Sequence, residues 1–158
     1  MEITTLIIIV IGVIVLILLA VWFLYTRKAG RNGDQLFEDM EGREFEEYCS
    51  ELLASKGYDN IEMTPASHDY GIDILADRDG ISYAIQCKCY SDPVGIKAIQ
   101  EAYAGKDYYN AMIGVVMTNQ DFTRPAREFA DKLNILLWDG DYVVNMIREV
   151  ALPEKKEK

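Results

Sequence analysis

The distribution of hydrophobic positions divides the chain into one long apolar segment and a region of short, patterned segments. Residues Leu6 to Tyr25 carry no charge, and about 20 apolar residues are enough to span the hydrocarbon core of a bilayer. The polar stretch 26–38 is typical of a linker, and beyond it apolar residues recur with helical and strand periods. The pattern predicts a transmembrane anchor over residues 1–25, a linker over 26–38, a folded domain over 39–152 and a charged tail over 153–158.

The apolar segment is expected to be retained as a membrane anchor. A cleavable signal peptide would begin with basic residues and end in small ones, whereas this run follows Met-Glu and ends in Trp22, Phe23 and Tyr25. Basic residues follow the segment and none precedes it, so the positive-inside rule places the N-terminus outside the cell. We therefore expect a single-pass protein of the cell membrane with its C-terminal domain in the cytoplasm.

The remaining segments alternate between helical and strand patterns. A helix at 41–57 places Phe45, Cys49, Leu52 and Leu53 on one face. The later elements are a strand at 58–64, a hairpin at 71–90, a helix at 91–110, a strand at 111–118, a helix at 123–134, a strand at 135–138 and a helix at 140–152. The order α-β-β-β-α-β-α-β-α predicts an α/β fold with a mixed β-sheet flanked by helices, because helical crossovers make the later strands parallel.

The hairpin at 71–90 carries polar side chains into the middle of the sheet. The Asp-Gly pair at 79–80 is a strong signal for a two-residue turn, and with this turn Asp73 faces Gln86. Lys88 is then a diagonal neighbour of Asp73 on the same face. Residues two apart share a face, so the opposite, core-facing side carries Ile72, Ile74, Ala76, Ile81, Tyr83, Ile85, Cys87 and Cys89.

Two interpretations of this polar face remain open. Carboxylate and amide oxygens can share a hard cation such as Mg²⁺, and a lysine beside it can position a water or neutralise a phosphate. Alternatively, Asp73 and Lys88 form an ordinary surface ion pair. Glu46 flanks the apolar face of the first helix while Glu47 points away, so Glu46 either supports the cation site or is a solvated helix acid.

Composition excludes several other chemistries. The formal net charge of −10 argues against a strongly basic nucleic-acid binder, but it is compatible with acids that hold cations. Three cysteines in a cytoplasmic domain indicate reduced thiols, and no second Cys or His pair accompanies the Cys-x-Cys at 87–89 to form a zinc site. The single histidine, His68, excludes hydrolases that need two or three histidine ligands.

Four separated stretches resemble one family. They are GREFEEYCSELLASKGY, HDYGIDI, YAIQCKCY, and GVVMTNQDFTRPAREFA with the following ILLWDG. In this order they are similar to the Mrr-like restriction endonucleases of the PD-(D/E)xK nuclease superfamily, over roughly residues 41–142. The resemblance implies a restriction-endonuclease-like fold. The transmembrane helix expected from the uncharged run would precede this fold and is a departure from the family.

The resemblance also implies roles for four residues. Asp73 would be the metal-binding acid, Gln86 a metal ligand or its organiser, Lys88 the catalytic lysine and Glu46 the helical acid. Mg²⁺, or alternatively Mn²⁺, would be the cofactor, and double-stranded DNA, methylated or not, the substrate, with a second copy of the chain as a further partner. The expected function is a membrane-anchored DNA endonuclease. The alternative is an inactive nuclease-fold module that binds nucleic acid or a protein partner at the membrane.

Overall fold

The computed structural model of the chain describes residues 10–21, 37, 40–65 and 70–151. It divides into two units, Met1–Asn32 and Gly33–Lys158. In the first unit, residues 10–21 form a helix. None of the helices in the described ranges has both the length and the apolar character needed to cross a membrane. The rest of the predicted anchor lies outside the described residues, so the anchor stays a prediction.

The second unit has the predicted order of elements. Its helices and strands are α3 (Gly42–Ser55), β1 (Asp59–Met63), β2 (Ile74–Arg78), β3 (Ile81–Lys88), α4 (Ile96–Tyr108), β4 (Ile113–Thr118), α5 (Arg124–Leu133), β5 (Ile135–Trp138) and α6 (Gly140–Ala151). The five strands form one sheet in the order β1-β2-β3-β4-β5. Strands β1 to β3 pair antiparallel, and β3 to β5 pair parallel, which confirms the predicted mixed sheet.

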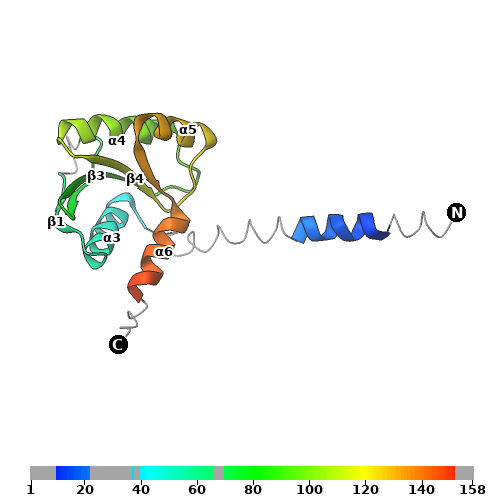
Figure 1. Cartoon of the computed structure of the whole chain (residues 1–158). Coiled ribbons are helices and arrows are strands. Elements are labelled where there is room, and N and C mark those ends of the chain that lie inside the picture. The colour runs from blue at the N-terminus through cyan, green and yellow to red at the C-terminus, as the bar shows by residue number, and fades with distance from the viewer. Residues whose placement is uncertain (1–9, 22–36, 38–39, 66–69, 152–158) are drawn as a thin grey trace. The chain divides into compact units, whose positions relative to one another are not determined.

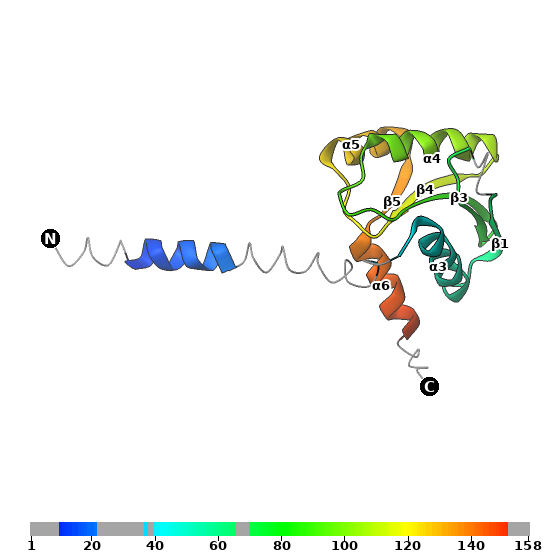
Figure 2. The same ribbon diagram turned by 180° about the vertical axis from the view of Figure 1, so that it is seen from behind.

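Helices cover both faces of this sheet. α4 and α5 lie on one face, and α3 and α6 lie on the other (Figure 1 and, from behind, Figure 2). Two separate hydrophobic clusters result, because successive strand residues point to opposite faces. In β4, for example, Val115 and Met117 belong to the cluster under α3 and α6, whereas Val116 belongs to the cluster under α4 and α5.

Helix α3 forms as its sequence predicts. Its N-terminus is closed by a capping box in which the backbone N–H of Glu41 donates to the Glu44 carboxylate at 3.0 Å. Its buried residues are the predicted Phe45, Cys49, Leu52 and Leu53. Gly57 follows with φ +79°, a left-handed conformation that suits glycine at a helix end.

The hairpin has the predicted register, with one departure at its open end. Asp79 and Gly80 form the turn, both with positive φ, and Leu75 pairs with Ala84. The predicted core face is wrong at Ile72, which packs against Gly105 in α4, whereas Ile74 belongs to the cluster under α3. Tyr70 and Gly71 take positive φ just before this point. The residues just before β2 therefore do not alternate between the two faces of the sheet as the residues within the strand do.

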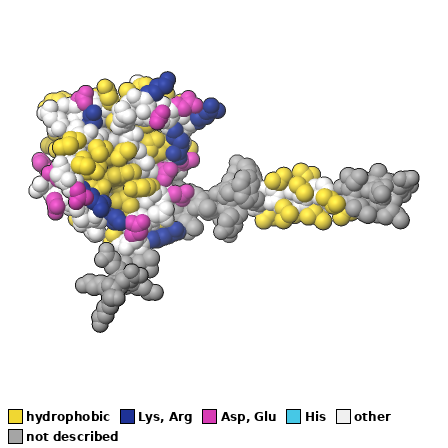
Figure 3. All heavy atoms as spheres, viewed as in Figure 1, with side chains coloured by type: hydrophobic (Ala, Val, Ile, Leu, Met, Phe, Trp, Pro, Cys, Tyr) yellow, Lys and Arg dark blue, Asp and Glu magenta, His cyan; other side chains and the backbone are white. Residues whose placement is uncertain are grey.

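Side chains on the outside of the domain are mixed in charge. Figure 3 shows hydrophobic side chains gathered in the middle of one face, with acidic and basic side chains around them. This face therefore presents no continuous basic surface.

Candidate active site

A cleft of about 660 Å³ opens where α3, the hairpin and α4 meet. Its lining includes Glu46, Asp73, Gln86 and Lys88, the four residues predicted from the sequence, together with Glu101. The fold brings these five side chains together from α3, from the residue just before β2, from β3 and from α4.

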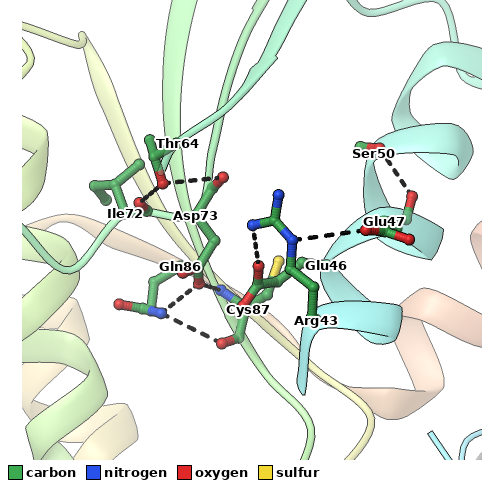
Figure 4. Close-up of polar contacts among 9 residues, drawn as sticks. All are labelled: Arg43, Glu46, Glu47, Ser50, Thr64, Ile72, Asp73, Gln86 and Cys87. Atoms are coloured by element: carbon green, nitrogen blue, oxygen red, sulfur yellow. Dashed lines mark hydrogen bonds and ion pairs between the residues drawn. The ribbon is translucent and has the colours of Figure 1, made fainter. Parts of the chain in front are cut away.

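Asp73 lies almost buried in the wall of this cleft, with 6% of its surface exposed. Its Oδ2 accepts hydrogen bonds from the side-chain amide of Gln86 and, at 2.6 Å, from the backbone N–H of Cys87 (Figure 4). Its backbone is also fixed, because its N–H donates to the Ile85 carbonyl and its carbonyl accepts from the Thr64 N–H, both at 2.9 Å. Such contacts leave the carboxylate little freedom to turn.

Gln86 is 4% exposed and holds its amide by two contacts. Nε2 donates to Asp73 and, at 3.3 Å, to the carbonyl of Cys87, while the amide oxygen is turned away from Asp73 (Figure 4). The predicted meeting of Asp73 and Gln86 is therefore seen between side chains. The backbone ladder has shifted by one residue there, because the N–H of Asp73 donates to Ile85.

Lys88 is the last residue of β3, and it makes an ion pair that the sequence pattern does not predict. Its Nζ lies 3.0 Å from Oε2 of Glu101 in α4, and the lysine side chain is 18% exposed. Burial alone would lower the pKa of Lys88. The hydrogen bond and charge of Glu101, with smaller effects of Tyr90 and Asp73, outweigh it and raise that pKa above its ordinary 10.5. Lys88 is therefore an ammonium at neutral pH.

Glu46 faces the cleft from α3, on the other side of the sheet from Glu101. Its side chain is 20% exposed against 60% for Glu47, as the helical projection predicts. Arg43 lies between the two acids, 3.0 Å from Glu46 and 3.6 Å from Glu47 (Figure 4). Glu46 is thus held at the cleft by a cation that is itself about half exposed.

Cys87 in β3 and Cys89 just after it line the cleft, but their thiols are engaged with the core side of the sheet. A hydrogen bond with Cys49, followed by burial, raises the pKa of the Cys87 thiol well above its ordinary value. The Sγ of Cys89 donates to the carbonyl of Met40 at 3.6 Å. In the part of the chain that the structure describes, no group of three or more His, Cys, Asp or Glu side chains could hold a metal ion. His68 lies outside the described residues.

The oxygen ligands of the cleft fit a magnesium ion with few protein ligands. Mg²⁺ usually binds one or two protein oxygens and keeps several waters. Asp73 would supply a carboxylate oxygen. Gln86 would supply its amide oxygen after a rotation about its last side-chain torsion, since nitrogen now faces the acid. Glu46 lines the same cleft, and its carboxylate would accept hydrogen bonds from waters bound to the ion.

Two features of the site carried no readable signal in the sequence. Glu101 occupies one of several polar positions on α4, and only the packing of that helix on the sheet shows that it meets Lys88. Gly71, which lines the cleft, approaches Glu101 so closely that a Cβ on the glycine would lie 2.8 Å from the Cβ of Glu101. Its φ of +78° also favours glycine.

Solved structures with a similar arrangement define the class of fold. The domain superposes on the modification-dependent restriction endonuclease AspBHI with a TM-score of 0.57 at 17% identity, covering 80% of this chain and 35% of that one. The MspJI restriction endonuclease in complex with a 27-mer oligonucleotide gives 0.56 at 20% identity, covering 74% and 30%. A protein of unknown function, AF1548, gives 0.58 at 23% identity, covering 68% and 66%. The fold is therefore restriction-endonuclease-like.

The sequence comparison identifies the family within this class. Residues 37–147 match the restriction endonuclease family Mrr_cat. The chain is also 30% identical over 113 residues to the type IV methyl-directed restriction enzyme EcoKMrr of Escherichia coli K12, covering 66% of this chain and 37% of that enzyme. The chain belongs to the Mrr restriction endonuclease family, and it spans 37% of the length of this curated relative.

Proposed function

We propose that the chain is a metal-dependent DNA endonuclease that hydrolyses phosphodiester bonds. The observation that carries the proposal is the joint placement of Asp73, Gln86 and Lys88 in one cleft, in direct or near contact. Membership of the Mrr family supports it. So do the relatives, since AspBHI is named for dependence on DNA modification and MspJI was solved with an oligonucleotide.

Each side chain would have a distinct part in this reaction. Asp73 and the amide oxygen of Gln86 would hold a divalent cation, which lowers the pKa of a bound water and offsets phosphate charge. The Lys88 ammonium would donate to a phosphate oxygen, where negative charge increases in the transition state. Glu46 would orient waters from the α3 side of the cleft, acting through hydrogen bonds and not by direct ligation.

The test is cleavage by the full chain in detergent micelles, on methylated and unmethylated duplex DNA, with Mg²⁺, Mn²⁺ or EDTA. Asp73→Ala should lose both metal binding, measured by calorimetry, and cleavage. Lys88→Ala should still bind Mg²⁺ while its rate falls on the order of a hundredfold, the typical effect of one lost transition-state contact. Glu46→Ala should be milder than either variant.

Glu47→Ala is the matched control, because Glu47 also contacts Arg43 but points out of the cleft. It should behave as wild type, and every variant must show an unchanged thermal transition. Wild-type cleavage rates in folded Asp73→Ala and Lys88→Ala would show that the site assignment is wrong. If the wild-type chain cuts no DNA with either metal, the alternative of a non-cutting binding module takes precedence.

We also propose that this activity is held at the membrane, with the domain in the cytoplasm. The support is the uncharged run Leu6–Tyr25 and the basic residues after it. The chain should stay with membranes through high-salt and carbonate washing, and protease added outside intact cells should leave the domain uncut. Release by washing would contradict the anchor, and digestion of the domain would contradict its orientation.

A further inference from the structure

Glu101 reaches the cleft from the face of the sheet opposite Glu46. α4 packs on that face, and its residues Ala98, Ile99 and Ala102 are buried in the cluster beneath it. Glu101 lies between these anchors, and its Oε2 is 3.0 Å from the Nζ of Lys88. The helix is thus held to the sheet on both sides of the position from which Glu101 extends.

The carboxylate of Glu101 has two cationic partners of very different exposure. Oε2 meets Lys88, which is 18% exposed, and Oε1 meets Lys97 at 3.5 Å, which is 88% exposed. An exposed pair within one helix turn is screened by water and contributes little. The contact with Lys88 is shorter than the contact with Lys97 and lies inside the cleft. It therefore contributes more to fixing the position of the Glu101 carboxylate.

The backbone packs just as closely around Glu101. A Cβ on Gly71 would lie 2.8 Å from the Cβ of Glu101 and 3.1 Å from its carbonyl oxygen, so only a glycine fits without a shift. Gly71 is two residues before Asp73. One close contact therefore ties the helix that carries Glu101 to the segment that carries the predicted metal-binding acid.

We propose that Glu101 is the positioning residue of Lys88: the ion pair between them fixes where the Nζ of Lys88 stands in the cleft, so that it is placed to donate a hydrogen bond to the phosphate. The inference rests on the proposed function, because it assigns how Lys88 is held toward the substrate. It does not depend on which metal is bound or on which DNA sequence is cut.

The other charged and titratable groups around Lys88 agree with this assignment. Asp73 precedes β2 and Tyr90 follows β3, and both favour the charged amine. Glu46 faces the same cleft from α3, and Lys97 of α4 pairs with the same carboxylate as Lys88. Glu101 is the acid in ion-pair contact with Lys88, so it is the group that can fix the position of the amine.

The first measurement is steady-state cleavage by the full chain in detergent at pH 8. Glu101→Gln keeps the shape of the side chain and removes its charge. Its kcat should fall about tenfold to a hundredfold, the cost of losing a hydrogen bond to a charged group. Its KM should change little, because Glu101 positions the lysine and does not itself bind the substrate. Lys97→Ala removes the exposed partner of the same carboxylate and should match wild type.

The second measurement needs no cleavage. The ¹³Cε resonance of Lys88 is identified by its absence in Lys88→Arg, and the order parameter of this carbon is measured in each variant. It should fall in Glu101→Gln, because the contact that holds the amine is weakened, and stay unchanged in Lys97→Ala. An unchanged order parameter in Glu101→Gln overturns the inference, and so does a wild-type kcat in that variant.

Failure of the proposed function has a different signature. If the wild-type chain cuts no DNA, that function is wrong, and the order parameter of Lys88 alone decides whether Glu101 positions the lysine. If Glu101→Gln does not fold, Glu101→Asp replaces it, because it keeps the charge but withdraws it by one methylene. Its kcat and its Lys88 order parameter should lie between those of wild type and of a chain lacking the contact, and wild-type values for both would overturn the inference.

Discussion

Replacing Gln86 by glutamate would turn the hydrogen-bonded pair in the cleft wall into two facing carboxylates. The change is nearly isosteric, so it alters charge and hydrogen bonding with little effect on volume. Gln86 and Asp73 are only 4% and 6% exposed, and the donor that is lost is the amide nitrogen that now binds Oδ2 of Asp73. Water can therefore screen the new repulsion only weakly.

The magnitude follows from these contacts. A hydrogen bond to a charged group contributes about 1.5–3 kcal/mol. Two carboxylates at such a separation do not both ionise freely, so one of them should take up a proton near neutral pH. Without metal we expect the Gln86→Glu variant to be about 3 kcal/mol less stable than wild type at pH 8, which for a domain of this size lowers Tm by roughly 10 °C.

Proton and metal should each reverse this loss. The shared proton gives the pair a raised pKa in the folded state, so stability is present at low pH and is lost as pH rises through that value. The deficit in EDTA should therefore shrink between pH 8 and pH 5. A cation held by both carboxylates should also restore stability, by about 2.7 kcal/mol at a hundredfold excess over its Kd.

The assay is thermal unfolding of the full chain in detergent, followed by tryptophan fluorescence, in EDTA and in Mg²⁺ at pH 5 to 8. Gln100→Glu is the matched control. It adds the same charge to the same cleft at an exposed position, and should change stability by less than about 0.5 kcal/mol. If Gln86→Glu is as stable as wild type in EDTA, or gains no more from Mg²⁺ than Gln100→Glu, the assigned contact with Asp73 is wrong.

Two further predictions concern stability. Gly71→Ala should lower the free energy of unfolding by about 2–4 kcal/mol, since it combines a left-handed φ with overpacking against Glu101. Gly57→Ala, with a similar φ but open space around it, should cost only about 1 kcal/mol, and equal losses in urea titrations would refute the packing argument. The raised pKa of Cys87 means that the native state holds this proton more tightly than the unfolded chain. Its stabilisation is therefore complete below the ordinary thiol pKa of 9.0 and is lost above it. Between pH 8 and pH 10 the unfolding free energy should fall by about 1.4 kcal/mol in total more in wild type than in Cys87→Ala, and equal losses would contradict the buried thiol.

Local patterns were sufficient to predict the sheet and most of the cleft. A two-residue turn at 79–80 fixes the register of a hairpin, because each residue added to one strand must pair with one on the other. The strand period then places Gln86 opposite the position before β2, and the helical period turns Glu46 inward and Glu47 outward. These relations involve neighbours within one element or one tight turn, so the order of residues determines them.

Relations between elements could not be predicted in the same way. Lys88 meets Glu101 only because α4 settles on the sheet at a particular height and rotation, which depend on side chains such as Ile99 in the buried cluster. Strand alternation places Ile72 on the wrong face because Ile72 lies before the first residue of β2, where the alternation no longer holds. The positive φ at Tyr70 and Gly71 breaks that alternation before the chain reaches Asp73.

The contacts of the cleft acids explain how a chain with a net charge of −10 can keep three carboxylates in one cleft. Asp73 accepts hydrogen bonds from Gln86 and Cys87, Glu46 pairs with Arg43, and Glu101 pairs with Lys88. Each acid is held from a different side, so their mutual repulsion is offset locally and no large rearrangement is needed to keep them near one another. Of the two cations in this set, Lys88 lines the cleft, where an incoming phosphate would meet its ammonium. An ammonium has three N–H donors, so Lys88 can donate to a phosphate oxygen and keep its contact with Glu101 at the same time.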